Sequence, residues 1–295
     1  MNLPDWNILY RGSLSSCNYT CSYCPFAKTN NTRTELDVDK AELFRFCDWV
    51  ERRDETIGIL FTPWGEALVR SYYRQAMVEL SHMANVSKVA IQTNMSCSTA
   101  WVEKADLESI AFWITYHPGE CKEYDFIEKC NSLSEMGAVY SVGVVGMKEH
   151  FEAILKLREQ LPDQVYLWIN AYKRDPNYYR ADDLDLLTSV DPYFKLNCQY
   201  HTSYGESCRA GHRSFTVDGG GNARRCHFVS QEIGNIYDDG FDQLLKPSNC
   251  SVAQCGCHIG YVNLEKLKLN SLFGSGVLER VPAQWPLFNY GGGSS

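Results

Sequence analysis

The sequence lacks the features that mark secreted, membrane-spanning and nucleic-acid-binding proteins. Its first residues contain no basic segment that leads into an apolar one, so there is no secretory signal. No apolar run approaches the roughly 18 to 20 residues of a membrane span. No Lys/Arg run forms a basic stripe, and the formal net charge is −8. We therefore expect a folded cytoplasmic protein with no membrane or nucleic-acid partner.

Cysteine, by contrast, is abundant: the chain has 13 in 295 residues. In a chain without a secretory signal, clustered cysteines are more often metal ligands or redox centres than disulfides. Four are scattered, and we expect them to be buried or half-buried small hydrophobes: Cys47, Cys97, Cys121 and Cys130. The other nine form an N-terminal triad and a C-terminal group, which contains Cys198, Cys208, Cys226, Cys250, Cys255 and Cys257.

Six short apolar segments rich in β-forming residues alternate with amphipathic helical segments. They span residues 6–11, 56–62, 88–94, 111–117, 139–146 and 165–172. Such an alternation predicts parallel strands joined by right-handed crossovers. Two architectures fit the pattern, a doubly wound open sheet and an open partial barrel, and periodicity alone does not separate them. Both place their chemistry at the carboxyl ends of the strands.

The unusual residues all follow strands, so one rim of one barrel would collect them. The cysteine triad follows the first strand, and Trp64, Gly65 and Glu66 follow the second. Asn94 ends the third, Thr115 and His117 end the fourth, and Asn170 ends the sixth.

The triad consists of Cys17, Cys21 and Cys24, a C-x3-C-x2-C spacing with Tyr23 directly before the last cysteine. A structural zinc ion needs four ligands in a closed tetrahedron. A [4Fe–4S] cluster normally takes four thiolates, so three would leave one iron open to a small molecule. The alternatives are a zinc loop completed by a distant residue and a coincidental group of cysteines.

This loop resembles the radical S-adenosylmethionine superfamily, whose motif matches Cys17, Cys21, Tyr23 and Cys24 position by position. In that family the open iron is chelated by S-adenosylmethionine, whose reductive cleavage gives a 5′-deoxyadenosyl radical. The resemblance covers roughly residues 6 to 190. It implies a [4Fe–4S] cluster with an open iron, S-adenosylmethionine, and an external electron donor such as flavodoxin or ferredoxin.

The resemblance also implies contacts to the cofactor. The family's GGE motif after the second strand corresponds to Trp64-Gly65-Glu66, with tryptophan in place of the first glycine. Its fifth-strand motif resembles residues 142–149, without the leading glycine, and Thr115 and His117 lie where ribose contacts often occur. The implied cofactor-binding residues are Tyr23, Trp64, Gly65, Glu66, Asn94, Thr115, His117, Val144, Glu149 and Asn170. No catalytic acid or base is assigned.

The C-terminal part predicts a β-hairpin, with strands over 214–218 and 223–229 and a glycine-rich turn between them. Together with Cys208, Cys226 and the late cysteines, it resembles the auxiliary iron–sulfur domains called SPASM and twitch. The shorter twitch type implies one further [4Fe–4S] cluster. The preferred ligands are Cys208, Cys226, Cys255 and Cys257, with Cys250 as the main rival. The alternative is a structural zinc site with four cysteine ligands.

We therefore expect an α/β fold: an open (β/α)6 partial TIM barrel over 1–195, and a cysteine-rich SPASM/twitch-like domain, a β-hairpin plus a short helix, over 196–275. A tail covers 276–295, and its Gly291–Ser295 end is set aside as a linker.

The expected function is radical hydrogen abstraction from an organic substrate, with net oxidation assisted by the second cluster. The alternatives are radical modification of a peptide or protein side chain, and a non-catalytic iron–sulfur or zinc protein that binds a partner or relays electrons. Few residues precede the first strand, so no domain that binds a peptide leader is expected. This expectation weighs mildly against an enzyme that modifies ribosomal peptides without a separate partner protein.

Overall fold

Six parallel strands pair in chain order and form the frame of the molecule. The computed structural model describes residues 3–26 and 29–286, so the end of the tail, Gly291–Ser295 included, lies outside the described residues. The six strands are β1 (Trp6–Tyr10), β2 (Ile57–Phe61), β3 (Val86–Thr93), β4 (Ile110–Thr115), β5 (Val139–Val145) and β6 (Tyr166–Asn170). Each predicted segment contains its strand to within two residues, and the open partial barrel is confirmed.

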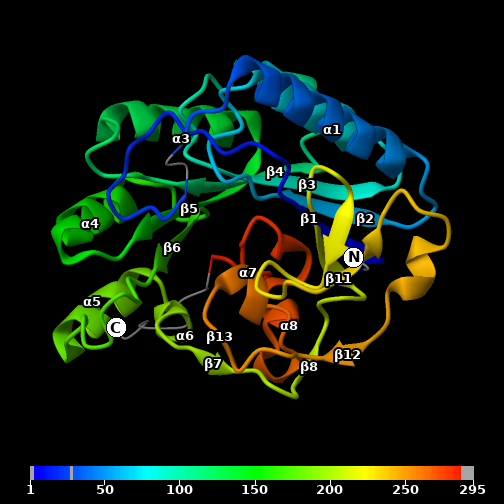
Figure 1. Cartoon of the computed structure of the whole chain (residues 1–295). Helices are drawn as coiled ribbons and strands as arrows, with labels where there is room; N and C mark the ends of the chain where they lie inside the picture. The colour runs from blue at the N-terminus through cyan, green and yellow to red at the C-terminus, as the bar shows by residue number, and fades with distance from the viewer. Residues whose placement is uncertain (1–2, 27–28, 287–295) are drawn as a thin grey trace.

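Helices cover the outer face of this sheet, as Figure 1 shows for the blue-to-green half of the chain. They are α1 (Arg33–Glu51), α2 (Ser71–Ser81), α3 (Glu123–Met136), α4 (Phe151–Gln160) and α5 (Ala181–Val190). Short 3-10 helices, η1 (Ala100–Lys104) and η2 (Lys148–His150), lie in the β3–β4 and β5–α4 connections. α1 begins with a capping box, in which Thr32 and Glu35 bind each other's backbone N–H groups.

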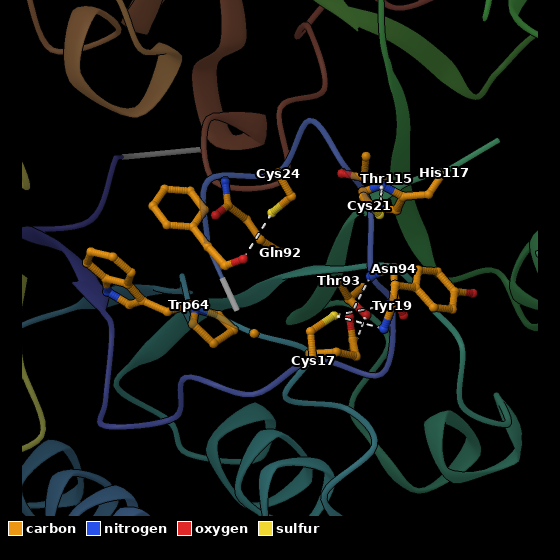
Figure 2. A pocket seen from close by; sticks show the side chains of 14 residues that line it. Cys17, Tyr19, Cys21, Cys24, Trp64, Gln92, Thr93, Asn94, Thr115 and His117 are labelled. Atoms are coloured by element: carbon orange, nitrogen blue, oxygen red, sulfur yellow. Dashed lines mark hydrogen bonds between the residues drawn. The ribbon is translucent and has the colours of Figure 1, made fainter. Parts of the chain in front are cut away.

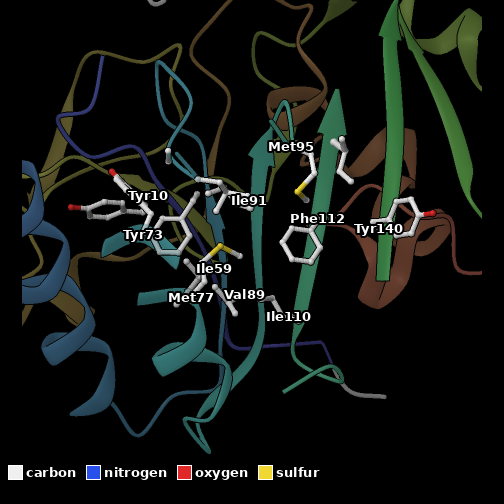
Figure 3. Close-up of a cluster of buried hydrophobic side chains, with 14 of the residues drawn as sticks. Tyr10, Ile59, Tyr73, Met77, Val89, Ile91, Met95, Ile110, Phe112 and Tyr140 are labelled. Carbon is white, nitrogen blue, oxygen red and sulfur yellow. The ribbon is translucent and has the colours of Figure 1, made fainter. Parts of the chain in front are cut away.

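Alternation along the strands gives the sheet two apolar faces. The outer face packs against the helices, and Figure 3 shows part of this core, with Ile59, Val89 and Phe112 pointing to the same side. The inner face carries Leu9 and Trp113 among others, and it packs against residues that come from the C-terminal segment. The lumen of the barrel is therefore closed by the chain's own C-terminal part.

The C-terminal segment also extends the sheet. β9 (Ser214–Val217) pairs in parallel with β1, and β10 (Asn222–Arg224) and β11 (Glu232–Asn235) continue antiparallel beyond it. The predicted hairpin is confirmed as β9–β10, although its second strand is shorter than expected. Residues before and after position 195 therefore share one sheet. The domain boundary expected between residues 195 and 196 remains a prediction.

The remaining elements are short. They are α6 (Phe194–Asn197), β7 (His201–Thr202), β8 (Ser207–Cys208), η3 (Phe241–Leu244), β12 (Ser248–Asn249), β13 (Gln254–Cys255), α7 (His258–Tyr261), η4 (Glu265–Leu267), α8 (Leu269–Phe273) and η5 (Gly274–Gly276). In Figure 1, α7 and α8 lie on the concave side of the sheet, opposite the outer helices. No helix of the described residues is long and apolar enough to cross a membrane.

Two of the scattered cysteines, Cys47 and Cys130, are buried in the outer core, as expected, and burial raises the pKa of each thiol to about 12 from an ordinary value of 9.0. Above pH 9 the unfolded chain therefore loses protons that the folded chain keeps. The free energy of unfolding should fall from about pH 9 to about pH 12, by about 1.4 kcal/mol per pH unit for each thiol.

Urea denaturation of the reduced protein at several alkaline pH values measures this slope. The double variant Cys47→Ala/Cys130→Ala should lose stability less steeply with pH than the wild type does. The matched cavity variant Ile154→Ala, at another fully buried position, should lower stability by a similar amount at every pH. Equal slopes in all three proteins would contradict the prediction.

Candidate functional site

The three cysteines of the N-terminal triad line one cavity of about 140 Å³ at the carboxyl ends of the strands. The cysteine loop forms one wall, and the ends of β2, β3 and β4 form the others (Figure 2). The cavity is lined by Cys17, Tyr19, Cys21, Cys24, Phe26, Pro63, Trp64, Gly65, Glu66, Gln92, Thr93, Asn94, Thr115 and His117. One rim thus collects the triad and six of the ten predicted cofactor-binding residues.

The cysteine loop is held in place by backbone contacts to the turn after β2. The N–H of Glu66 donates to the carbonyl of Ser16 at 3.1 Å, and the N–H of Trp64 donates to that of Leu14 at 3.3 Å. Between these two bonds, a Cβ added to Gly65 would lie 1.8 Å from the carbonyl oxygen of Ser16. A glycine is therefore required at position 65, because any side chain would collide with the loop's backbone.

Glu66 ties the ends of β2 and β3 together. Its side chain is 2% exposed, and its carboxylate accepts hydrogen bonds from Thr93 Oγ1 at 2.6 Å, from Asn94 N at 2.6 Å and from Leu68 N at 3.1 Å. Burial raises the pKa of this carboxyl, while the hydrogen bonds and the charge of Lys129 oppose that rise. The carboxylate thus fixes the geometry of the cavity wall that it lines.

On the opposite wall, His117 contacts the cysteine loop. Its Nδ1 lies 2.9 Å from the hydroxyl of Tyr23 and 3.4 Å from Sγ of Cys21. Burial lowers the pKa of His117 to about 4, with the charge of His150 acting in the same direction and that of Glu120 against it. The imidazole is therefore neutral near pH 7, and it holds Tyr23 through its ring nitrogen.

The thiols of the triad lie in surroundings that favour binding to a cationic metal centre. Burial raises the pKa of Cys17, and it raises that of Cys21 to about 11. Thiolates at these positions require a nearby positive charge, which iron supplies. Asn94 directs its Nδ2 toward Sγ of Cys17 at 3.9 Å. The donor set and its surroundings fit an iron–sulfur cluster held by three thiolates.

Four predicted cofactor contacts are not part of the cavity lining: Tyr23, which contacts His117, and three residues that lie farther away. Val144 is fully buried in the outer core, on the helix side of the sheet. Glu149 is exposed on η2. Asn170 is exposed at the end of β6, where its carbonyl accepts the N–H of Gly146 at 2.9 Å. Their cofactor roles remain predictions.

Sequence reasoning missed other residues of the cavity lining. Tyr19 lies between Cys17 and Cys21, and its position inside the cysteine motif could have indicated that it lines the cavity. Gln92 was detectable as a polar residue near the end of β3, two residues before Asn94. Phe26 and Trp64 form an edge-to-face pair 4.9 Å apart, and both are more than two-fifths exposed.

Most of the C-terminal cysteines lie in segments that the fold brings together. The negative charge of Cys250 raises the pKa of Cys208, Cys226 and Cys255, although burial is the main cause at each. Strand pairing brings these segments together, because Ser248 pairs with Cys208 and the N–H of Cys250 donates to Glu206. Cys250 thus lies near Cys208, Cys226 and Cys255, and the choice between Cys250 and Cys257 as fourth ligand remains a prediction.

Cys257 also acts on this group, because its charge raises the pKa of Cys255 more than that of Cys250 does. Its thiol is influenced by the charges of Arg280, Lys173 and Arg11, which lower its pKa against the larger effect of burial. Within the described part of the chain, no three His, Cys, Asp or Glu side chains converge in the way that the ligands of a single metal ion do. In a [4Fe–4S] cluster each thiolate binds a different iron. The absence of such a group therefore applies to sites for a single metal ion and not to iron–sulfur clusters.

No protein-family model matches the chain, and no curated protein matches it either. Among solved structures, native anSMEcpe with bound AdoMet has a TM-score of 0.54 and 14% identity, over 82% of this chain and 81% of that one. The same protein with AdoMet and the Kp18Cys peptide gives 0.53 and 12%, over 82% and 81%. BtrN in complex with AdoMet and 2-DOIA gives 0.41 and 18%, over 83% and 89%, a score too low to support an argument. At these identities the similarity establishes the fold alone: the chain shares the fold of anSMEcpe, whose structures contain bound AdoMet.

Proposed function

We propose that this protein is a radical S-adenosylmethionine enzyme that abstracts a hydrogen atom from an organic substrate. One observation carries the proposal: Cys17, Cys21 and Cys24 line a single cavity together with the ends of β2, β3 and β4. The fold around that cavity is shared with the AdoMet-bound structures of anSMEcpe. We expect the enzyme to work in the cytoplasm, with flavodoxin or ferredoxin as its electron donor.

The three thiolates would hold a [4Fe–4S] cluster and leave one iron for S-adenosylmethionine. When bound, this pair supplies the one-electron chemistry that generates a carbon-centred radical from the cofactor. The residues of this chain bind and orient it. The backbone at Gly65 and the polar groups of Asn94 and Thr115 face the same cavity and suit the cofactor's amino, carboxylate and ribose groups.

The aromatic pair Phe26 and Trp64 lies at the exposed edge of the cavity. Their rings cover that edge with apolar surface and restrict the access of water. A site that generates a reactive radical requires such exclusion of water. Tryptophan at position 64, where the family usually has glycine, thus contributes to the enclosure of the site.

We further propose an auxiliary [4Fe–4S] cluster held by Cys208, Cys226, Cys250 and Cys255. Four protein thiolates would saturate that cluster, so it would accept an electron from the substrate rather than bind the substrate, giving net oxidation. The second candidate function is radical modification of a peptide side chain. It is favoured by one observation, that a structure of anSMEcpe contains a bound peptide.

The test is 5′-deoxyadenosine formation by the anaerobically reconstituted protein with S-adenosylmethionine and dithionite. The wild type should form the product slowly even without substrate. The Cys17→Ala/Cys21→Ala/Cys24→Ala variant should form none while it keeps the iron of the auxiliary site. A wild-type protein with a fully loaded N-terminal cluster that never cleaves the cofactor, with or without candidate substrates, would favour a non-catalytic iron–sulfur protein.

A further inference from the structure

A carboxylate outside the cavity lining is bound to the middle of the cysteine loop, residues 17–24. Glu120 lies in the connection between β4 and α3, and its Oε2 accepts the N–H of Thr20 at 3.1 Å. Its Oε1 accepts the hydroxyl of Thr20 at 3.3 Å. Thr20 directly precedes Cys21. One carboxylate therefore binds both polar hydrogens of the residue before a predicted cluster ligand.

The connection that carries Glu120 is a closed turn. The N–H of Glu120 donates to the carbonyl of His117 at 3.1 Å, and Pro118 and Gly119 lie between them. Gly119 has a φ of +88°, and proline followed by a glycine with positive φ is the sequence that a type II turn favours. His117 at the start of the turn binds the hydroxyl of Tyr23 at 2.9 Å. The two ends of this turn thus hold the cysteine loop at two separate points.

A cation holds the same loop from another connection at the rim. Arg174 lies between β6 and α5, and its Nη2 donates to the carbonyl of Tyr23 at 2.8 Å. Tyr23 directly precedes Cys24. The connection is anchored beside Arg174, because the N–H of Tyr172 donates to the hydroxyl of Tyr179 at 2.7 Å. Side chains of opposite charge therefore bind the peptide groups before the second and third cysteines of the motif.

The two charges affect a metal cluster in this loop with opposite sign. Burial is the main cause that raises the pKa of Cys21 to about 11, and the charge of Glu120 adds to it. The carboxylate thus disfavours further negative charge at that thiol, while a guanidinium favours it. Nearby charge is one of the factors that set the reduction potential of an iron–sulfur cluster. A negative neighbour lowers the potential and makes the reduced cluster a stronger reductant.

We propose that Glu120 and Arg174 are positioning residues of the N-terminal cluster site, which hold the cysteine loop from two rim connections and set the cluster's reduction potential through their opposite charges. This inference rests on the proposed function and concerns the control of the same site. Glu120 is half-buried and Arg174 is exposed, so water and salt screen the cation more strongly. Glu120 therefore has the larger effect on the potential.

A redox titration of the anaerobically reconstituted protein, followed by electron paramagnetic resonance, measures this potential. Each reduced cluster takes up one electron from dithionite, and its signal is identified by its change when S-adenosylmethionine is added. In Glu120→Gln the amide oxygen still accepts the N–H of Thr20 but the charge is lost. The ratio of reduced to oxidised cluster at a fixed potential should therefore rise about threefold.

Arg174→Gln should change the same ratio in the opposite direction. We expect the ratio to fall about twofold at low salt and by less at high salt, because the arginine is exposed. The control is Glu128→Gln, which removes an exposed carboxylate from the outer helix α3 and changes the net charge as Glu120→Gln does. It should leave the ratio unchanged.

Amide hydrogen exchange, read by mass spectrometry on the full chain with and without iron, tests the positioning role separately. Glu120→Ala removes both bonds to Thr20, so the peptide that contains Thr20 should exchange about tenfold faster than in the wild type. Glu120→Gln should restore most of the protection, and Glu128→Gln should not alter it.

Unchanged potentials in Glu120→Gln and Arg174→Gln, or equal exchange in the wild type and Glu120→Ala, would overturn the inference. The proposed function fails by a different result, a wild-type protein with a loaded N-terminal cluster that never cleaves S-adenosylmethionine.

Discussion

Replacement of Gly65 with alanine is expected to abolish the N-terminal cluster and to lower S-adenosylmethionine cleavage at least 100-fold, a loss of about 2.7 kcal/mol in transition-state stabilisation. The reason is steric. The new Cβ would lie 1.8 Å from the carbonyl oxygen of Ser16, 2.4 Å from its carbonyl carbon and 3.0 Å from its nitrogen. All three are backbone atoms, so no side chain can rotate away, and the segment that leads into Cys17 must move.

Iron and acid-labile sulfide analysis, together with 5′-deoxyadenosine formation, measures this effect. The control is Gly220→Ala, whose added Cβ would have its nearest contacts at 3.4 and 3.5 Å, the second of them an ordinary van der Waals distance. Gly220 also lacks the left-handed backbone of its neighbour Gly221. The control should keep its iron and its activity. Full cluster loading in Gly65→Ala would show that the loop tolerates displacement and that position 65 does not set the site.

The six strands and the cavity rim were predictable because they follow from local patterns. Each strand is a short apolar run, and polar residues at the ends of parallel strands meet at one edge of the sheet. Asp39 shows where local patterns fail. Its place in a helix rich in charged residues suggests a surface position. Asp39 is nevertheless fully buried and accepts hydrogen bonds from Ser13, Tyr72 and Tyr73. Its role depends on three segments that only the fold brings together.

The same limit applies to the C-terminal segment. The hairpin is encoded locally by its glycine turn, but the parallel pairing of β9 with β1 joins residues about 200 positions apart. No spacing in the sequence reveals that contact. The inner core likewise places Val277 and Leu278 against Leu9 and Leu60. A chain segment that looks like an appendage therefore closes the barrel lumen, and the buried position of Arg280 follows from that closure.

Exchange of single C-terminal cysteines is expected to distinguish the two candidate ligand sets of the auxiliary cluster. A chain with both clusters should bind about eight irons, and Cys250→Ala should retain about four after a chelator wash, since one iron of the cubane loses its protein ligand. Cys257→Ala should retain about eight. The reason is that Cys250 acts on the thiols of three cysteines, Cys208, Cys226 and Cys255, whereas Cys257 acts on Cys255 alone among these three and has cations near its own thiol.

The reverse outcome would be equally informative. If Cys257→Ala loses four irons and Cys250→Ala loses none, the ligand set is Cys208, Cys226, Cys255 and Cys257. The charges of Arg280 and Lys173, which act on the thiol of Cys257, would then help to balance the negative charge of the cluster. Electron transfer would respond accordingly, because removal of a positive charge beside a cluster lowers its reduction potential. The two iron counts thus decide which cysteine completes the auxiliary cluster and whether Arg280 and Lys173 act on one of its ligands.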